Sequence, residues 1–254
     1  MTTNPFLRAL PLVALAACSL GTAPEAPEGS VKVLFIGNSL TYRNDLPQTI
    51  AQLALSAGLP ECYCVAIARP DFALEDHYDF GDAVRALQKE SWDYVVMQQG
   101  PSALPSSRAN LIQWAGLFGD MIDENGAQAI MYGVWPENER SSEFPNVTES
   151  YRQAADAIGA LFAPAGEAWL NAWAQDSTLP LYASDDFHPS TMGTYLAALT
   201  VFERIYDHTA IGVQASAVVD GRVQNWPVAI VLLLQEAAAA ANAAEDARVV
   251  ARRR

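Results

Sequence analysis

An apolar run that ends in a serine constrains the chain most strongly. Residues 31–36 read Val-Lys-Val-Leu-Phe-Ile, and Gly37, Asn38 and Ser39 follow directly. A short run of β-branched and aromatic residues with a single charge is typical of a strand buried on both faces of a parallel sheet. Gly37 and Asn38 tolerate tight, left-handed backbone geometry, so we expect the chain to turn there. The turn would place the Ser39 hydroxyl at the carboxyl end of the strand, where open α/β sheets bind ligands.

Strand and helix patterns alternate along the rest of the chain. Short apolar runs bounded by turn residues are separated by segments whose apolar positions have helical period. The expected strands cover residues 31–36, 62–67, 92–97 and 128–134, and residues 162–168 are expected to be a short fifth strand and its turn. The expected helices cover 46–59, 82–89, 111–125, 149–161, 169–174, 190–206 and 227–247. This alternation predicts a three-layer α/β/α sandwich, flavodoxin-like in arrangement, with a central parallel sheet of about five strands.

Composition favours one domain and excludes some partners. The chain has 254 residues and is 51% hydrophobic, which allows one sizeable core, so we expect residues 31–254 to form a single domain with a C-terminal helix. The formal net charge of −14 argues against nucleic acid or an anionic membrane surface as a partner. The apolar stretch 228–234 is too short to cross a bilayer.

The N-terminus has the pattern of an export signal. Arg8 precedes the apolar stretch 9–17, which is too short to span a bilayer as a mature helix, so residues 1–17 are expected to be a signal peptide. Leu15-Ala16-Ala17-Cys18 resembles the lipobox of bacterial lipoproteins, whose cysteine becomes the lipidated N-terminus. The alternative is an ordinary signal with an incidental cysteine. We favour lipidation at Cys18, with residues 18–30 as a Pro- and Glu-rich tether. The protein would then reach the cell envelope or periplasm and touch a membrane only through this anchor.

The other two cysteines stand two residues apart on the second expected strand. Cys62 and Cys64 would point to the same face, with a Cα separation near the upper limit for a disulfide. We therefore expect free buried thiols, and a strained bridge is the alternative. A zinc site is not expected, because no second Cys or His pair stands at ligand spacing. No other metal and no organic cofactor is indicated.

A second motif near residue 185 supplies what a nucleophilic serine needs. Acyl transfer through serine requires a base that takes the hydroxyl proton and a group that orients the base. His188 follows Asp185 by three residues and precedes an expected helix, whereas His77 and His208 lack this context. We interpret His77 as a surface residue, with a place in the pocket as the alternative, and His208 as a surface residue. Asp186 competes with Asp185 for the orienting role.

The two motifs together resemble a known family. Gly37-Asn38-Ser39-Leu40 and Asp185-x-x-His188-Pro189 are similar to the first and fifth sequence blocks of the SGNH (GDSL-like) esterases and lipases, and the resemblance runs over residues 31–206. It implies the SGNH hydrolase fold, with Ser39 as nucleophile, His188 as general base and Asp185 as the residue that orients the base. In this family the oxyanion hole combines the serine amide, a glycine amide of the second block and an asparagine side chain of the third.

The second and third blocks depart from the family pattern. The second block has no glycine and contains Pro70, which has no N–H, so Asp71 is the best positional match for the backbone donor. In the third block Gln98 and Gln99 stand where the family has asparagine. A glutamine amide is the same donor on a longer side chain, so either residue is a candidate. These differences indicate a divergent branch.

The resemblance implies a secreted or lipid-anchored serine esterase that cleaves a small acyl ester, such as acetyl on carbohydrate or cell-wall glycan. The alternative is a non-catalytic ligand-binding protein of the same fold with an incomplete oxyanion hole. A flavodoxin-like nucleotide binder is disfavoured, because no glycine-rich phosphate loop follows the first strand. The sequence leaves open the acyl group, the alcohol and the oligomeric state.

Overall fold

A parallel sheet forms the centre of the computed structural model, which describes residues 26–214 and 216–252. The sheet has five strands in the order β2-β1-β3-β4-β5. They are β1 (Val31–Gly37), β2 (Cys62–Ala68), β3 (Tyr94–Met97), β4 (Gln128–Gly133) and β5 (Leu161–Pro164). The predicted three-layer α/β/α sandwich is therefore confirmed. The predicted signal peptide, residues 1–17, and the predicted lipidation site Cys18 lie outside the described residues.

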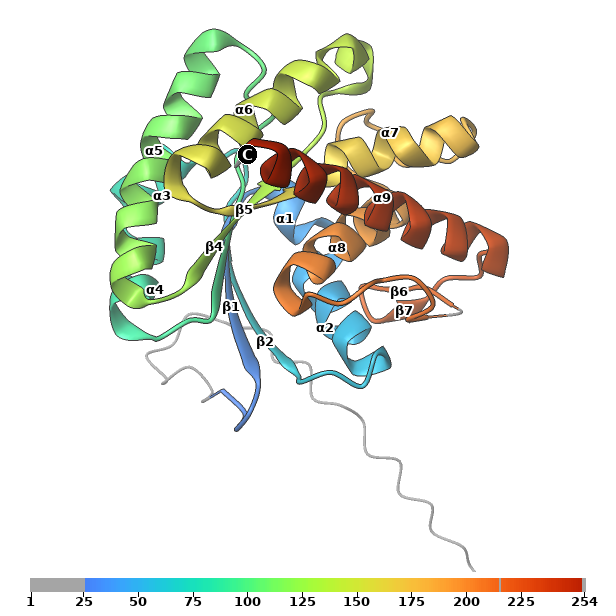
Figure 1. Ribbon diagram of the computed structural model, residues 1–254, viewed down its shortest axis with the longest axis horizontal. Coiled ribbons are helices and arrows are strands. Elements are labelled where there is room, and N and C mark those ends of the chain that lie inside the picture. Colours follow the sequence, from blue (N-terminus) through green and yellow to red (C-terminus); the bar gives the residue numbers. More distant parts are fainter. Residues whose placement is uncertain (1–25, 215, 253–254) are drawn as a thin grey trace, which may run out of the picture.

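Helices cover both faces of the sheet (Figure 1). They are α1 (Ser39–Tyr42), α2 (Leu46–Ser56), α3 (Leu74–Phe80), α4 (Asp82–Lys89), α5 (Pro105–Asn125), α6 (Phe144–Ile158), α7 (Ala165–Gln175), α8 (Thr191–Tyr206) and α9 (Val228–Arg252), with 3-10 turns η1 (Arg43–Asp45) and η2 (Asn138–Glu143). On one side of the sheet lie α3, α4 and α5, and on the other lie α2, α8 and α9. Helix α6 packs on α5 and β4, and α7 packs on α8 and α9.

The strand order places a ligand crevice beside β1. The chain leaves β1 for β2 on one side and returns to β3 on the other, so neighbouring connections diverge at the carboxyl ends of β1 and β3. Open α/β sheets bind ligands at such a point. Ser39 follows β1 and Gln98 follows β3, so both lie at this crevice. The side chains of residues 33–36 are completely buried, as predicted for a strand covered on both faces.

Several short elements of the structure were not predicted, among them a helix and a hairpin. Helix α3 has seven residues, of which only Leu74 and His77 are buried, too few to establish a helical period in the sequence. A small antiparallel hairpin joins β6 (Val218–Val219) to β7 (Arg222–Val223), and each of its strands has only two residues. Elements this short leave no periodic signal.

The expectation of free thiols on β2 is wrong. Cys62 and Cys64 form a disulfide, with a Cα–Cα distance of 5.3 Å. That distance lies within the usual range for disulfides, so the strand is shorter here than an ideal strand. Because β2 is an edge strand that pairs only with β1, its backbone can contract without disturbing a second neighbour.

The tight turn after β1 needs glycine for space rather than for left-handed geometry. Asn38 has an extended backbone, with φ −126° and ψ −151°, and Gly37 is not among the residues with positive φ. A Cβ on Gly37 would lie 2.3 Å from the Thr41 hydroxyl and 2.6 Å from Oε1 of Gln98. Left-handed residues occur later, at Asn44, with φ 53°, and Asp45, with φ 48°. The predicted turn exists, but its proposed backbone geometry is wrong.

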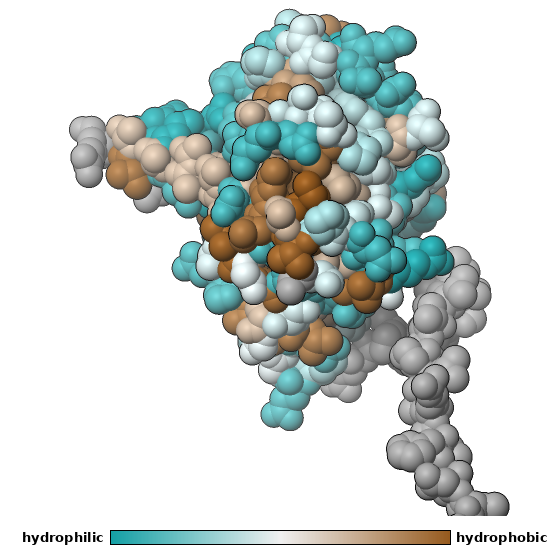
Figure 2. Space-filling view, turned by 90° about the vertical axis from the view of Figure 1, so that its right-hand side faces the viewer, coloured by the Kyte–Doolittle hydropathy of each residue, from teal (hydrophilic) through white to brown (hydrophobic). Residues whose placement is uncertain are grey.

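Helix α9 is a long apolar helix that packs against the fold. By length and mean hydropathy (1.4) it could cross a membrane, but it packs on α7 and α8 and carries buried polar side chains at Gln235, Asn242 and Glu245. These features are those of a core helix. Figure 2 shows hydrophobic side chains gathered on the face where α9 begins, and Val228 and Leu232, one turn apart on α9, are among the exposed apolar residues.

Close packing of α8 depends on Gly193. A Cβ at this position would lie 2.2 Å from the Leu181 carbonyl oxygen and 2.5 Å from the ring of Trp169. Since Ser190 caps α8 through the amides of Met192 and Gly193, this contact also fixes the position of the segment that precedes the helix.

We expect Gly193→Ala to lower the free energy of unfolding by about 1–3 kcal/mol, because a backbone carbonyl and a buried ring must move to make room. Gly116→Ala on α5 is the matched control, since a Cβ there would meet nothing within 4 Å. The control should leave stability unchanged or raise it by up to about 1 kcal/mol. Urea unfolding measures both, and equal effects would contradict the packing argument.

Candidate active site

The nucleophile position is built by the turn between β1 and α1. Ser39 is the first residue of α1 and only 7% exposed. Asn38 caps this short helix, since its side-chain oxygen accepts from the Leu40 amide at 3.1 Å and its carbonyl accepts from the Thr41 amide at 2.9 Å. The cap fixes where the serine hydroxyl lies.

Ser39, His188 and Asp185 form a continuous hydrogen-bonded row. The distance between Ser39 Oγ and His188 Nε2 is 2.9 Å, and that between His188 Nδ1 and Asp185 Oδ2 is 2.7 Å. The other Asp185 oxygen accepts from the backbone amides of His188 (2.9 Å) and Phe187 (3.2 Å). The hydrogen bond from the His188 side chain, together with these amides, lowers the pKa of Asp185 to about 2. The carboxylate therefore stays ionised at neutral pH and holds the proton of His188 on Nδ1, which leaves Nε2 of a neutral imidazole free to accept from Ser39.

The loop that carries Asp185 and His188 is fastened to the loop after β4. Trp135 Nε1 donates to the Phe187 carbonyl at 3.0 Å, and the backbone amide of Asn138 donates to the Asp186 carbonyl at 2.8 Å. The Tyr182 hydroxyl donates to the Pro136 carbonyl at 2.6 Å. Nothing in the local sequence around residue 135 pointed to this support.

Asp186, the alternative orienting residue, has a different partner. Its carboxylate accepts from Asn138 Nδ2 at 3.0 Å, and the carboxylate bonded to His188 is that of Asp185. Asp186 has φ 55°, a left-handed backbone geometry within this loop.

Asn44 joins the two halves of the site. Its side-chain amide donates to the Pro189 carbonyl at 3.0 Å and to the Thr194 hydroxyl at 2.9 Å. This residue follows α1 closely in sequence and reaches the residue next to His188. Its residue type is the one local signal, because asparagine adopts left-handed backbone geometry more readily than most residues.

Gln98 holds the nucleophile turn. Its Oε1 accepts from the Asn38 amide at 3.0 Å and from the Thr41 hydroxyl at 2.8 Å. Its Nε2 donates to Asn38 Oδ1 at 2.9 Å and to the Gln99 carbonyl. Gln98 is completely buried, and both of its amide hydrogens have protein acceptors. In this arrangement Gln98 positions the turn and has no hydrogen left for an oxyanion.

The side chain of Gln99 is also bonded to protein groups, on the side of the site where α3 begins. Its Oε1 accepts from the Leu74 amide at 3.1 Å, and its Nε2 donates to the Ser102 hydroxyl at 2.9 Å and toward Asn110 Oδ1 at 3.5 Å. It is 4% exposed. Gln99, which like Gln98 was a candidate oxyanion donor, thus fixes the start of α3.

The backbone amides of Ser39 and Asp71 are available as donors. Among the hydrogen bonds of the described residues, the amides of Ser39 and Asp71 donate to no protein acceptor. Asp71 has φ 60° and sits in the turn after β2, where the Phe72 carbonyl accepts from Asn38 Nδ2 at 3.1 Å. Asp71 thus lies on a segment that is bonded directly to the residue before the nucleophile.

The surface interpretation of His77 is wrong. His77 is 1% exposed, and its Nε2 lies 2.7 Å from the Gly37 carbonyl oxygen, to which it must donate. Burial, opposed in part by this hydrogen bond, lowers the pKa of His77, so the ring is neutral. The residue supports the turn before Ser39 from the side of α3. His208 is exposed, as predicted.

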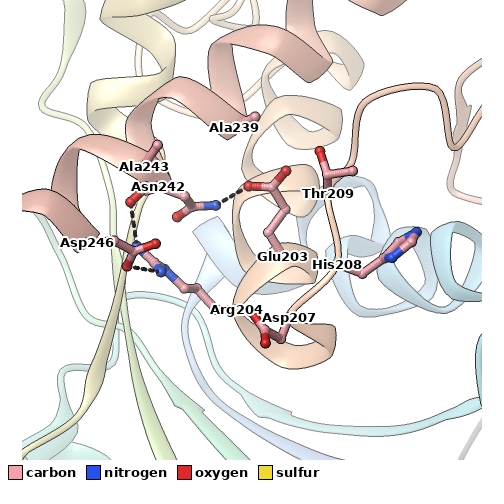
Figure 3. Close-up of a pocket in the computed structure, with 9 residues that line it drawn as sticks. All are labelled: Glu203, Arg204, Asp207, His208, Thr209, Ala239, Asn242, Ala243 and Asp246. Atoms are coloured by element: carbon pink, nitrogen blue, oxygen red, sulfur yellow. Dashed lines mark hydrogen bonds and ion pairs between the residues drawn. The ribbon is translucent and has the colours of Figure 1, made fainter.

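Away from the Ser39 row, a pocket lies between α8 and α9, lined by Glu203, Arg204, Asn242 and their neighbours (Figure 3). Its polar side chains bind one another: Asn242 donates to Glu203 at 2.7 Å, and Arg204 pairs with Asp246 at 2.6 Å. None of the three residues in the Ser39 row lines it. Within the described part of the chain, no group of three or more His, Cys, Asp or Glu residues is placed to hold a metal ion.

Solved structures with the same architecture are known. The chain is similar to an SGNH hydrolase candidate from Slackia heliotrinireducens, with 28% identity and a TM-score of 0.57 over 68% of this chain and 98% of that one. The chain has the SGNH hydrolase fold. A protein of a domain family of unknown function from Bacteroides uniformis shares it at a TM-score of 0.64, with 20% identity over 82% of this chain and 93% of that one. So does a catalytic mutant of an acetylxylan esterase from Geobacillus stearothermophilus, at a TM-score of 0.53, with 17% identity over 70% and 95% of the two chains.

No protein-family model matches this chain, and no curated protein sequence does. The fold is thus supported by structural likeness, whereas the chemistry has to be argued from the residues of the site.

The bonds of Gln98 and Gln99 lead to a prediction that separates a positioning role from an oxyanion role. We expect Gln98→Ala and Gln99→Ala each to lower the free energy of unfolding by about 1–3 kcal/mol, because each leaves buried donors and acceptors unpaired. A glutamine that served only as an oxyanion donor would instead lower kcat, typically by about 10² to 10³, without affecting stability. Urea unfolding and steady-state kinetics of both variants distinguish the two roles.

Proposed function

We propose that the protein is a serine esterase of the SGNH type that hydrolyses a small acyl ester. The observation that carries the proposal is the row Ser39 Oγ, His188 Nε2, His188 Nδ1, Asp185 Oδ2, with successive hydrogen bonds of 2.9 and 2.7 Å. A base within hydrogen-bond reach of a serine hydroxyl, itself oriented by a carboxylate, is the arrangement that activates serine for acyl transfer.

The reaction has two displacements. Ser39 Oγ attacks the ester carbonyl while its proton passes to His188 Nε2, and the alcohol leaves after taking that proton. The acyl group is then bonded to Ser39. A water molecule gives its proton to His188 and attacks the acyl carbonyl, and Ser39 recovers its proton as the acid leaves. Asp185 stays ionised throughout and stabilises the imidazolium that forms in each step.

The negative charge that develops on the ester carbonyl oxygen during attack must be stabilised by hydrogen-bond donors. We assign this role to the backbone amides of Ser39 and Asp71, which have no acceptor among the described residues. A backbone amide is a preorganised dipole, and its contribution does not depend on a side-chain rotamer. Gln98 and Gln99 act on this hole by holding Asn38 and Leu74 in place.

Structural neighbours are consistent with ester chemistry. They include an acetylxylan esterase and a lipase/acylhydrolase from Enterococcus faecalis, at 17% and 16% identity. Acetyl groups on carbohydrate or cell-wall glycan, the kind of substrate named for one of these neighbours, are the first substrates to screen.

The second candidate is a non-catalytic ligand-binding protein with the same fold. The observation that favours it is that both glutamine side chains of the third block are occupied by protein partners. A protein whose oxyanion hole has fewer donors than the family pattern would still have the ligand pocket, but it would hydrolyse an ester more slowly. Turnover of p-nitrophenyl acetate by the intact protein, abolished in Ser39→Ala, excludes this candidate.

We expect Ser39→Ala and His188→Ala each to remove nearly all esterase activity, and the double variant to lose little more, because the two residues act as one unit. Asp185→Ala should cost less, since an imidazole without its carboxylate still populates the productive tautomer in part. Single-turnover acylation of folded variants measures each effect. Near-normal acylation in His188→Ala would remove the histidine from the mechanism.

We further propose that the chain is exported and anchored through a lipid on Cys18, in the cell envelope or periplasm. The support is the sequence Leu15-Ala16-Ala17-Cys18 and the polar tether that follows it. The globular part would then face substrates outside the cytoplasm.

Mass spectrometry of protein from the membrane fraction should find a diacylated or triacylated N-terminal Cys18. Cys18→Ser should move the protein into the soluble fraction, because the anchor cannot form. A membrane-bound chain with an unmodified N-terminus at another residue would contradict lipidation.

A further inference from the structure

A second groove adjoins the loop that carries Asp185 and His188. It has a volume of about 450 Å³ and lies between α7, η2 and this loop. Its lining consists of two aromatic side chains, a polar rim and a stretch of backbone: Asn138, Ser141, Trp173, Ser177, Leu179, Pro180, Leu181, Tyr182, Ala183 and Asp186. Asp186, which lines the groove, is the residue after Asp185 in the sequence, so the groove and the row that activates Ser39 share one loop.

Two neighbouring aromatic side chains, Trp173 and Tyr182, line the groove. Trp173 and Tyr182 lie with ring centroids 5.7 Å apart and an angle of 33° between the rings, and both are partly exposed. Trp173 Nε1 donates to the Leu179 carbonyl at 2.9 Å, and the Tyr182 hydroxyl donates to the Pro136 carbonyl. Burial raises the pKa of Tyr182, so this hydroxyl keeps its proton. Since both polar atoms are bonded to backbone carbonyls, the rings are held in place.

The rim offers polar groups without a positive charge. The hydroxyls of Ser141 and Ser177 are exposed and form no hydrogen bond within the described part of the chain. One Asp186 oxygen accepts from Asn138, and the carboxylate has further acceptor capacity. None of the lining residues, all of which the structure describes, is Arg or Lys.

We propose that this groove is a subsite for a neutral oligosaccharide, so that the ester cleaved at Ser39 is an acyl group carried on a glycan chain. The inference rests on the proposed esterase function. A pyranose ring has apolar C–H faces and a rim of hydroxyls, which match a rigid aromatic pair with donors and acceptors around it. In this proposal one glycan chain occupies the groove and extends past the loop of Asp185 and His188, so that its acyl group reaches Ser39.

Other occupants fit the same lining less well. A lipid tail would cover the hydroxyls of Ser141 and Ser177 and the Asp186 carboxylate without giving them hydrogen bonds, and such burial is unfavourable. A polyanionic glycan would place its carboxylates near Asp185 and Asp186 with no basic side chain in the groove to neutralise them. The chemistry therefore points to an uncharged sugar chain.

The test compares a small ester with a glycan ester. Ser141→Trp and Ser177→Trp place a bulky side chain into the groove from exposed positions. We expect each to lower the ratio of kcat/KM for acetylated xylotetraose to kcat/KM for p-nitrophenyl acetate at least tenfold. Ser142→Trp is the matched control, because Ser142 is exposed on the same 3-10 turn but does not line the groove, and its ratio should match that of the unmodified protein.

A binding measurement tests the proposed subsite without requiring ester turnover. Ser39→Ala should bind unacetylated xylohexaose, with a change in tryptophan fluorescence, and Ser39→Ala combined with Ser141→Trp should bind it at least tenfold more weakly. If every variant is inactive on all esters but this difference in binding persists, the esterase proposal fails and the subsite stands.

The opposite outcome overturns the subsite alone. If p-nitrophenyl acetate is hydrolysed while the groove variants keep the ratio of the unmodified protein, the glycan does not occupy this groove. Equal binding of xylohexaose by both Ser39→Ala proteins, or none by either, overturns it as well.

Discussion

The side-chain amide of Gln98 joins the ends of two parallel strands, and the position of Ser39 depends on it. A completely buried primary amide must find two acceptors and at least one donor, and here the turn after β1 supplies most of them through Asn38 and Thr41. The arrangement also requires Gly37, because a Cβ at that position would collide with Gln98 and Thr41. The geometry of the nucleophile is therefore specified by side-chain pairing across the sheet as much as by the local turn.

The other half of the row stands on a loop rather than on a strand or helix, and its rigidity comes from its neighbours. Trp135, Asn138 and Tyr182 form hydrogen bonds that tie this loop to the segment after β4, and Asn44 ties its end to the nucleophile side. A functional loop works when a scaffold holds it, since a shift of the imidazole of about 1 Å would lengthen the hydrogen bond to Ser39 substantially.

Local patterns in the sequence predicted the architecture and the two motifs of the candidate site. The apolar run before Ser39 and the spacing from Asp185 to His188 are signals within a few residues, and period and composition carry them. The sequence did not predict the burial of His77, the disulfide between Cys62 and Cys64 or the bonds of the glutamines. Each of these depends on which distant segments lie together, or on a local contraction of a strand. No alternation of residue types encodes either property.

The unusual second and third blocks are linked by contacts in the structure. Asn38 Nδ2 donates to the Phe72 carbonyl, and Gln99 Oε1 accepts from the Leu74 amide, so both residues hold the segment that contains Asp71. In the SGNH esterases the oxyanion donors are the serine amide, a glycine amide and an asparagine side chain. In the proposed mechanism both glutamine side chains are occupied, so the backbone amides of residues 39 and 71 serve as the donors. The same glutamines hold that backbone in place, Gln98 through Asn38 and Gln99 through Leu74.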